Sequence, residues 1–149
     1  MVGRGHVGHT GFEPHESSRY NVRAVGAVHL EIDILAPRPG ARPRSRTVEV
    51  LVDTGATLPV LPRTVLGSLG IRPTERVKLL VADGRRITRE TGNVRLRVMG
   101  REVWSRVVFG RPRDPAVLGL TVLEQLGLTV DPRRRRLVPT EILLLPLGR

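Results

Sequence analysis

The stretch "VEVLVDTGAT", residues 48–57, constrains the fold of this chain more than any other. Its valines recur at every second position, which is the pattern of a half-buried β-strand. The pattern stops at Asp53, and a new apolar run, "LPVLP", follows shortly afterwards. Asp and Gly also form ordinary surface turns. Because apolar sequence lies on both sides, we expect the Asp53 carboxylate to lie inside the fold, where an unpaired charge is costly.

The rest of the chain predicts short strands separated by turns. Strands are indicated by "AVHLEIDIL" (27–35) and "TVEVLVD" (47–53), with "APRPGARPRSR" (36–46) between them as a long basic loop. Further strand pairs are expected over 75–91 around Asp83-Gly84, over 93–110 with a hinge near Gly100, and over 128–139. Short helices are expected over 61–71, ending before Gly70, and over 121–126, ending at Gly127.

The composition indicates one mostly-β domain with an aliphatic core. The 149 residues are 40% hydrophobic but only 3% aromatic, so Val, Leu and Ile must fill the interior. The chain has no cysteine, which excludes disulfides and thiolate metal sites. We therefore predict a small closed or partly closed β-barrel with one or two short helices.

The chain divides into three segments by composition. Residues 1–20 are rich in Gly, His, Ser and Glu and predict a flexible tail, whose histidines His6, His9 and His15 would have no fixed geometry for a metal. Residues 21–140 form the predicted domain. Residues 141–149 begin with "EILLLPL", an apolar strand or tail with no obvious partner inside the domain.

The net charge of +11 comes almost entirely from arginine. A nucleic-acid-binding domain would usually add a recognition motif or stacking aromatic residues, and neither is found. A solvated basic surface is therefore favoured over a nucleic-acid partner. The start of the chain has no apolar signal region, and "ILLLPL" is too short to span a bilayer, so no membrane association and a cytoplasmic location are expected.

Two motifs together resemble those of the retropepsins, the retroviral-type aspartic proteases and their bacterial-type single-domain relatives. The first is "VLVDTGAT", and the second is "AVLGLTVLEQLGL", about sixty residues later. The similarity covers about Val48 to Pro132. It implies the retropepsin fold with one lobe per chain, because the sequence has no second D-T-G or D-S-G. A second aspartate would then come from a second copy, across the two-fold axis of a homodimer.

The resemblance also implies the chemistry. Asp53 and its counterpart would activate a water molecule that hydrolyses peptide bonds in a peptide or protein substrate, without a metal or cofactor. Thr54 would lock the two aspartate loops together, and Gly55 would allow close backbone approach. A Ser in place of Ala56 could donate a hydrogen bond that favours the charged carboxylate. Because Ala cannot, we expect a pH optimum nearer neutral than that of pepsin-like enzymes.

Three other segments take roles from the same resemblance. The hairpin tip Ala82-Asp83-Gly84-Arg85 corresponds to the flap that closes over the substrate, although family flaps are often richer in glycine. The motif Val117-Leu118-Gly119 brings the chain tightly past the aspartate loop. The terminal strand 141–149 corresponds to strands that interleave at the dimer interface.

Two alternatives to an active endopeptidase remain open. One is a catalytically weak or inactive retropepsin-like module for dimerisation or peptide binding. The other is an arginine-rich nucleic-acid binder, which would show steep salt dependence. The sequence does not predict the substrate.

Overall fold

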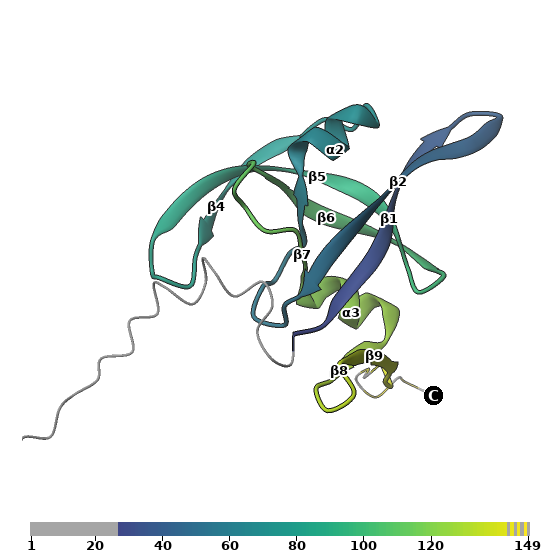
Figure 1. Cartoon of the computed structure of the whole chain (residues 1–149), viewed down its shortest axis with the longest axis vertical. Coiled ribbons are helices and arrows are strands. Elements are labelled where there is room, and N and C mark those ends of the chain that lie inside the picture. The colour runs from purple at the N-terminus through teal and green to yellow at the C-terminus, as the bar shows by residue number, and fades with distance from the viewer. Residues whose placement is uncertain (1–26, 143, 145, 147, 149) are drawn as a thin grey trace, which may run out of the picture.

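The computed structural model of the chain describes residues 27–142, 144, 146 and 148 (Figure 1). The predicted tail, residues 1–20, lies outside the described residues. The strands are β1 (His29–Arg38), β2 (Ala41–Val52), β3 (Val60–Pro62), β4 (Glu75–Leu80), β5 (Arg86–Val98), β6 (Arg101–Gly110), β7 (Val117–Leu118), β8 (Leu128–Asp131) and β9 (Arg136–Pro139). The helices are α2 (Arg63–Ser68) and α3 (Leu120–Leu126).

Six strands form a hydrogen-bonded ring. Their order is β1-β2-β7-β3-β6-β5, and pairing of β5 with β1 closes the ring, while β4 extends it from the outer edge of β5. Strands β8 and β9 form a separate antiparallel pair. The prediction of a mostly-β chain with two short helices is confirmed, and the arrangement is consistent with a retropepsin-like fold.

The core is aliphatic, as the scarcity of aromatic residues requires. Phe109 is the one aromatic side chain among the buried hydrophobic residues of the described chain. Helix α2 contributes Leu66 to the interior, and α3 contributes Val122 and Leu123. Fully buried side chains from the ring include Ile34, Leu61, Leu96, Val98, Val107 and Leu118.

The predicted helix ends and tight turns are found where glycine was expected to allow them. Helix α3 ends at Gly127 with φ of 62°, and the chain leaves α2 through Gly70 with φ of 74°. The turn between β5 and β6 contains Gly100 with φ of 75°. A left-handed conformation costs glycine little, which is why these stops can be read from the sequence.

The predicted long basic loop over residues 36–46 is wrong. Strand β1 continues to Arg38 and β2 begins at Ala41, so only Pro39 and Gly40 form the turn. Gly40 has φ of 69°, and the register shifts between Ala36 and Arg38. The strand was not predicted because proline and arginine interrupt the apolar alternation by which strands are recognised. Proline is nevertheless tolerated at an unpaired strand edge.

The chain ends outside any regular element. The described residues 141, 142, 144, 146 and 148 are not in a strand, and Ile142 and Leu144 are 61% and 75% exposed. The expected role of this segment at a dimer interface stays a prediction. Neither helix of the described chain has the length and apolar content needed to cross a membrane.

Candidate active site

The aspartate loop, residues 53–59, follows directly from the buried end of β2. The amide of Asp53 donates to the carbonyl of Leu118 at 3.1 Å, and the amide of Ala56 donates back to the carbonyl of Asp53 at 3.2 Å. The amide of Gly55 donates to Oδ1 of Asp53 at 2.9 Å. These bonds fix both the backbone and the carboxylate of Asp53, which is half-buried.

Gly55 leaves space for that carboxylate. A Cβ at residue 55 would lie 3.2 Å from Asp53 Oδ1, tighter than an ordinary contact. Ala56 is half-buried, whereas Thr54 and Gly55 are exposed in the single chain. Among the described residues, the hydroxyl of Thr54 has no hydrogen-bond partner. The loop therefore presents the face that carries Thr54 outwards.

Strand β7 lies between the two strands that flank the aspartate loop. Val117 and Leu118 pair in parallel with Leu51 and Val52 of β2, and Val117 also pairs with Val60 of β3. The two segments separated by about sixty residues in the sequence thus meet at one place. Leu118 accepts the bond from the Asp53 amide, so this strand positions the carboxylate.

The start of α3 is bonded to the other side of the aspartate loop. The amide of Leu120 donates to the carbonyl of Ala56 at 2.7 Å. The amide and the hydroxyl of Thr121 both donate to the carbonyl of Thr57, at 3.1 and 2.9 Å. Gly119 makes this approach possible, because a Cβ there would lie 2.6 Å from the carbonyl carbon of Leu58.

The hairpin of β4 and β5 carries the predicted flap residues at its tip. The amide of Val81 donates to the carbonyl of Arg85 at 3.0 Å, and Gly84 has φ of 84°. The carboxylate of Asp83 accepts from the Arg85 amide at 3.0 Å and from its guanidinium Nε at 2.6 Å. The tip is therefore held by an ion pair as well as by the turn itself.

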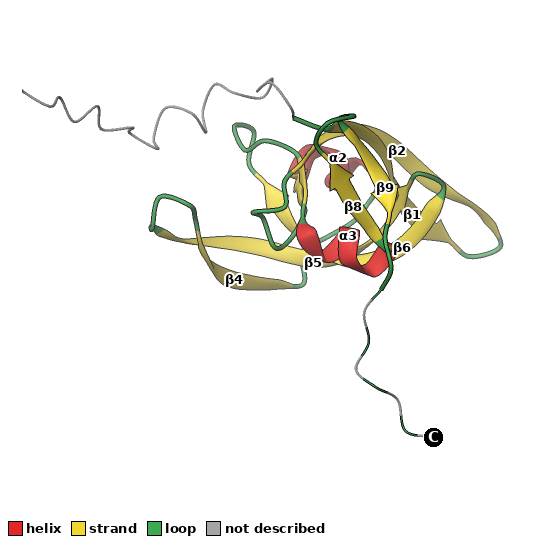
Figure 2. Ribbon diagram, turned by 90° about the horizontal axis from the view of Figure 1, so that it is seen from below, coloured by secondary structure: helices red, strands yellow, loops and turns green. Residues whose placement is uncertain are grey.

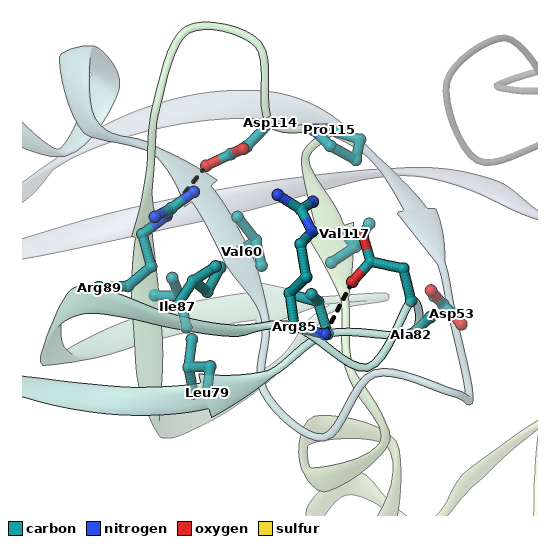
Figure 3. Close-up of a pocket in the computed structure, with 13 residues that line it drawn as sticks. Asp53, Val60, Leu79, Ala82, Arg85, Ile87, Arg89, Asp114, Pro115 and Val117 are labelled. Carbon is teal, nitrogen blue, oxygen red and sulfur yellow. Dashed lines mark hydrogen bonds and ion pairs between the residues drawn. The ribbon is translucent and has the colours of Figure 1, made fainter. Parts of the chain in front are cut away.

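Asp53 and this hairpin line one cavity of about 430 Å³ (Figure 3). Arg85, directly before β5, and Ile87 and Arg89 within β5 occupy alternate positions, and all three face the cavity. Predicted residues that line it are Asp53, Ala82, Asp83, Arg85 and Val117, whereas the structure does not bring Thr54, Gly55, Ala56, Gly84, Leu118 or Gly119 to its wall. The remaining lining residues are mostly apolar: Val60, Leu79, Val81, Val108 and Pro115.

A second ion pair lies at this cavity and was not predicted from the sequence. Nε of Arg89 lies 3.5 Å from Oδ2 of Asp114, and the same carboxylate oxygen accepts from the Arg111 amide at 2.8 Å (Figure 3). Asp114 precedes Pro115, a pair typical of a turn, so nothing local marks it as a functional residue. Extending the alternation of β5 from Arg85 would have found Arg89, but no local pattern relates it to Asp114.

A comparison with protein-family models finds a match to the gag-polyprotein putative aspartyl protease family over residues 44–125. This range contains Asp53, the β4–β5 hairpin and β7, and it covers more than half of the 149 residues. The chain belongs to this aspartyl protease family. The aspartyl protease match ends within α3, so β1, β8 and β9 lie outside it. No curated protein matches the chain.

Proposed function

We propose that the protein is an aspartic endopeptidase whose active site forms between two copies of the chain. The observation that carries the proposal is the position of Asp53. Its carboxylate is oriented by the Gly55 amide at the wall of a cavity that the β4–β5 hairpin also lines. Family membership makes an aspartyl-protease mechanism the natural use of that carboxylate.

The chemistry requires two carboxylates around one water molecule. The ionised Asp53 takes a proton from the water as its oxygen adds to the scissile carbonyl carbon, and the protonated Asp53 gives its proton to the carbonyl oxygen. The resulting tetrahedral diol collapses when the Asp53 that took the water proton gives it to the amide nitrogen and the other Asp53 takes a proton from a diol hydroxyl. The C–N bond then breaks to leave a carboxylic acid and an amine. Because the two carboxylates share protons, they titrate as one unit.

The second carboxylate is best supplied by a second copy. Asp83 and Asp114 also line the cavity, but Asp83 is bonded to Arg85 and Asp114 lies beside Arg89. Both carboxylates are therefore already engaged by arginines of the same chain. A homodimer with Asp53 near its two-fold axis needs no further residue. The exposed Thr54 would then face the loop of the partner.

The cavity supports a substrate with apolar side chains near the scissile bond. Its wall is formed largely by aliphatic residues from five strands: Val60 of β3, Leu79 of β4, Ile87 of β5, Val108 of β6 and Val117 of β7. Burying an apolar side chain there would contribute about 1.5–3 kcal/mol. A peptide in extended conformation could lie between the hairpin and the aspartate loop.

The test is a peptide-library digest over pH 3–8 with the wild type and Asp53→Asn. We expect cleavage by the wild type only, with both proteins dimeric in sedimentation experiments. The substitution keeps the side-chain shape and removes the ionisable group. Cleavage that persists in Asp53→Asn, or a wild type that stays monomeric at high concentration while cleaving, would rule out the shared site.

One observation favours the alternative of a peptide-binding module without turnover. The hairpin tip has a single glycine and is braced by the Asp83–Arg85 ion pair, so it is more restrained than a glycine-rich lid. In that case the digest would give no products at any pH, while the dimer would still bind peptides from the same library.

A further inference from the structure

The outer part of the β1–β2 hairpin leaves the ring as a two-stranded ribbon, which we call the basic ribbon (residues 36–46). Strand β1 pairs with β5 only at Asp33–Leu35, and β2 pairs with β7 only at Leu51 and Val52. Beyond those residues the two strands pair only with each other. Figures 1 and 2 both show the ribbon projecting away from the other elements. Residues 37–47 are all exposed.

The basic ribbon has an unbalanced charge. It carries Arg38, Arg42, Arg44 and Arg46, and no acidic residue occurs from Ile34 to Val48. Among the described residues, none of these four arginines forms an ion pair. Their guanidinium groups bond only to carbonyl oxygens, Arg44 to Ser68 at 2.9 Å and Arg46 to Ser45 at 3.2 Å.

Outside the basic ribbon, some described arginines form ion pairs and others do not. Partners within the described chain are found for seven of them: Arg63 with Glu90, Arg85 with Asp83, Arg89 with Asp114, Arg95 and Arg97 with Glu102, Arg106 with Glu75, and Arg134 with Asp131. The other described arginines outside the ribbon form no ion pair: Arg72, Arg76, Arg86, Arg101, Arg111, Arg113, Arg133, Arg135 and Arg136. The ribbon differs from them because its four unpaired arginines lie on one projecting element that has no acidic residue from Ile34 to Val48.

The composition of the ribbon argues against a protein partner. Its remaining residues are Ala, Pro, Gly and Ser, so it lacks the aromatic and large aliphatic side chains that anchor protein interfaces. Pro37, Pro39 and Pro43 cannot donate backbone hydrogen bonds, which blocks the addition of a further strand at these positions. A polyanion fits the surface better, since it requires charge and reach rather than apolar contact.

We propose that the basic ribbon binds the phosphate backbone of double-helical nucleic acid. The major groove of a B-form duplex admits a two-stranded β-ribbon. Arg42, Arg44 and Arg46 alternate along β2 and so recur on one face about every 6.8 Å. Guanidinium groups bind phosphate oxygens bidentately. The proposed contacts are to phosphate oxygens, which are the same for every base, so binding is independent of base sequence.

This geometry is what the sequence alone did not provide. Residues 36–46 were expected to form an irregular loop, and the absence of a recognition motif weighed against nucleic acid. A ribbon presents its charges at fixed spacing and needs no such motif for phosphate contact. The proposal is independent of the peptidase function, because Arg38 and Arg42 precede the family match and the ribbon does not line the cavity of Asp53.

The test compares two full-length variants that lose the same charge. The ribbon variant carries Arg38→Gln, Arg42→Gln, Arg44→Gln and Arg46→Gln. The control carries Arg133→Gln, Arg134→Gln, Arg135→Gln and Arg136→Gln at the β8–β9 turn and the start of β9. Binding is measured by fluorescence anisotropy with two unrelated DNA duplexes between 50 and 200 mM salt, beside thermal unfolding as a check of folding.

We expect the ribbon variant to bind on the order of tenfold more weakly, with a salt slope smaller by up to about 3.6, and the control to resemble the wild type. Both duplexes should bind equally. Equal weakening of the two variants would show diffuse charge and overturn the proposal. So would a lack of binding by the wild type, or competition by polyglutamate at lower concentrations than by DNA, which would indicate an acidic protein partner.

Discussion

Residue 119 has no room for a side chain. A Cβ there would lie 2.6 Å from the carbonyl carbon of Leu58 and 2.8 Å from the carbonyl oxygens of Leu58 and Thr57, all backbone atoms of the aspartate loop. Gly119→Ala should therefore lower the free energy of unfolding by about 1–3 kcal/mol. Urea denaturation would measure this loss, and activity should fall with it because the loop must shift.

Gly67 provides the matched control for this substitution. It lies within α2, and a Cβ there would meet nothing within 4 Å. Gly67→Ala should leave stability unchanged or raise it by up to about 1 kcal/mol, because alanine has the higher helix propensity. Equal behaviour of the two variants would contradict the packing argument at Gly119.

The residue after Gly55 offers a test of the protonation chemistry. A serine at position 56 could donate a hydrogen bond that favours a charged carboxylate, which alanine cannot do. The acidic limb of the kcat/KM profile of Ala56→Ser should therefore move to lower pH, while the wild type keeps an optimum nearer neutral. Ala41→Ser, on the basic ribbon, is the control and should not change the profile. A wild-type maximum below about pH 3.5 would contradict the interpretation.

At the scale of elements, substitutions at two hairpin tips distinguish a loss of flap function from a loss of stability caused by backbone strain. Gly84 and Gly40 have φ of 84° and 69°, and a Cβ at either position would meet nothing within 4 Å. Gly84→Ala and Gly40→Ala should each cost about 1–2 kcal/mol of stability through the left-handed conformation. Only Gly84→Ala should also lower kcat/KM, because its neighbours Asp83 and Arg85 line the cavity. Equal losses of activity in Gly84→Ala and Gly40→Ala would contradict the assignment of the β4–β5 tip as the flap.

The β5–β6 hairpin carries a pH-dependent contribution to stability. Hydrogen bonds from the guanidinium groups of Arg97 and then Arg95 hold the pKa of Glu102 below its usual value. A lowered carboxyl pKa stabilises the fold above the pKa of the unfolded chain, and this contribution is lost as pH falls through the lower folded-state pKa. Glu102→Gln should thus cause a small fall in Tm at neutral pH that disappears in acid. The exposed Glu31→Gln is the control and should show neither effect.

Local chemistry explains which elements could be predicted from the sequence. The ends of α2 and α3 and the β4–β5 turn were found because Gly70, Gly127 and the Asp83-Gly84 pair set the backbone conformation within a few residues. The β1–β2 ribbon was missed because strand pairing there depends on its partner strand and not on apolar alternation. The placement of β7 between β2 and β3 likewise depends on pairing across many residues, which no local pattern specifies.

The candidate site likewise has one part that could be predicted from the sequence and one part that could not. The position of Asp53 at the end of a strand could be predicted, because alternation and the flanking apolar runs are local features. The Arg89–Asp114 pair could not, since its members come from β5 and the loop before β7. In a site formed by several strands, the sequence therefore predicts the residue at which a strand ends. It predicts much less well which side chains from different strands lie together in the wall of the cavity.

At the scale of the whole molecule, the proposed site is incomplete in one chain. Specific activity should consequently fall as the protein is diluted, because dissociation separates the two Asp53 carboxylates. Parallel measurement of sedimentation and of initial cleavage rates should give the same midpoint concentration. Activity per chain that stays constant through the dissociation range would indicate a site within one chain.

The terminal segment should control that association. Ile142 and Leu144 are 61% and 75% exposed in the single chain, and neighbouring exposed apolar side chains are typical of an interaction surface. Deleting residues 143–149 keeps Ile142 beside Gly127 and the bond from the Thr140 amide to the Gly127 carbonyl, so the domain should still fold.

We expect the shortened chain to dimerise more weakly and to lose activity at concentrations where the full chain is active. Because the cavity is unchanged, raising the protein concentration should restore cleavage. A shortened chain that dimerises normally would move the interface elsewhere, and one that dimerises but never cleaves would place the segment in the site itself.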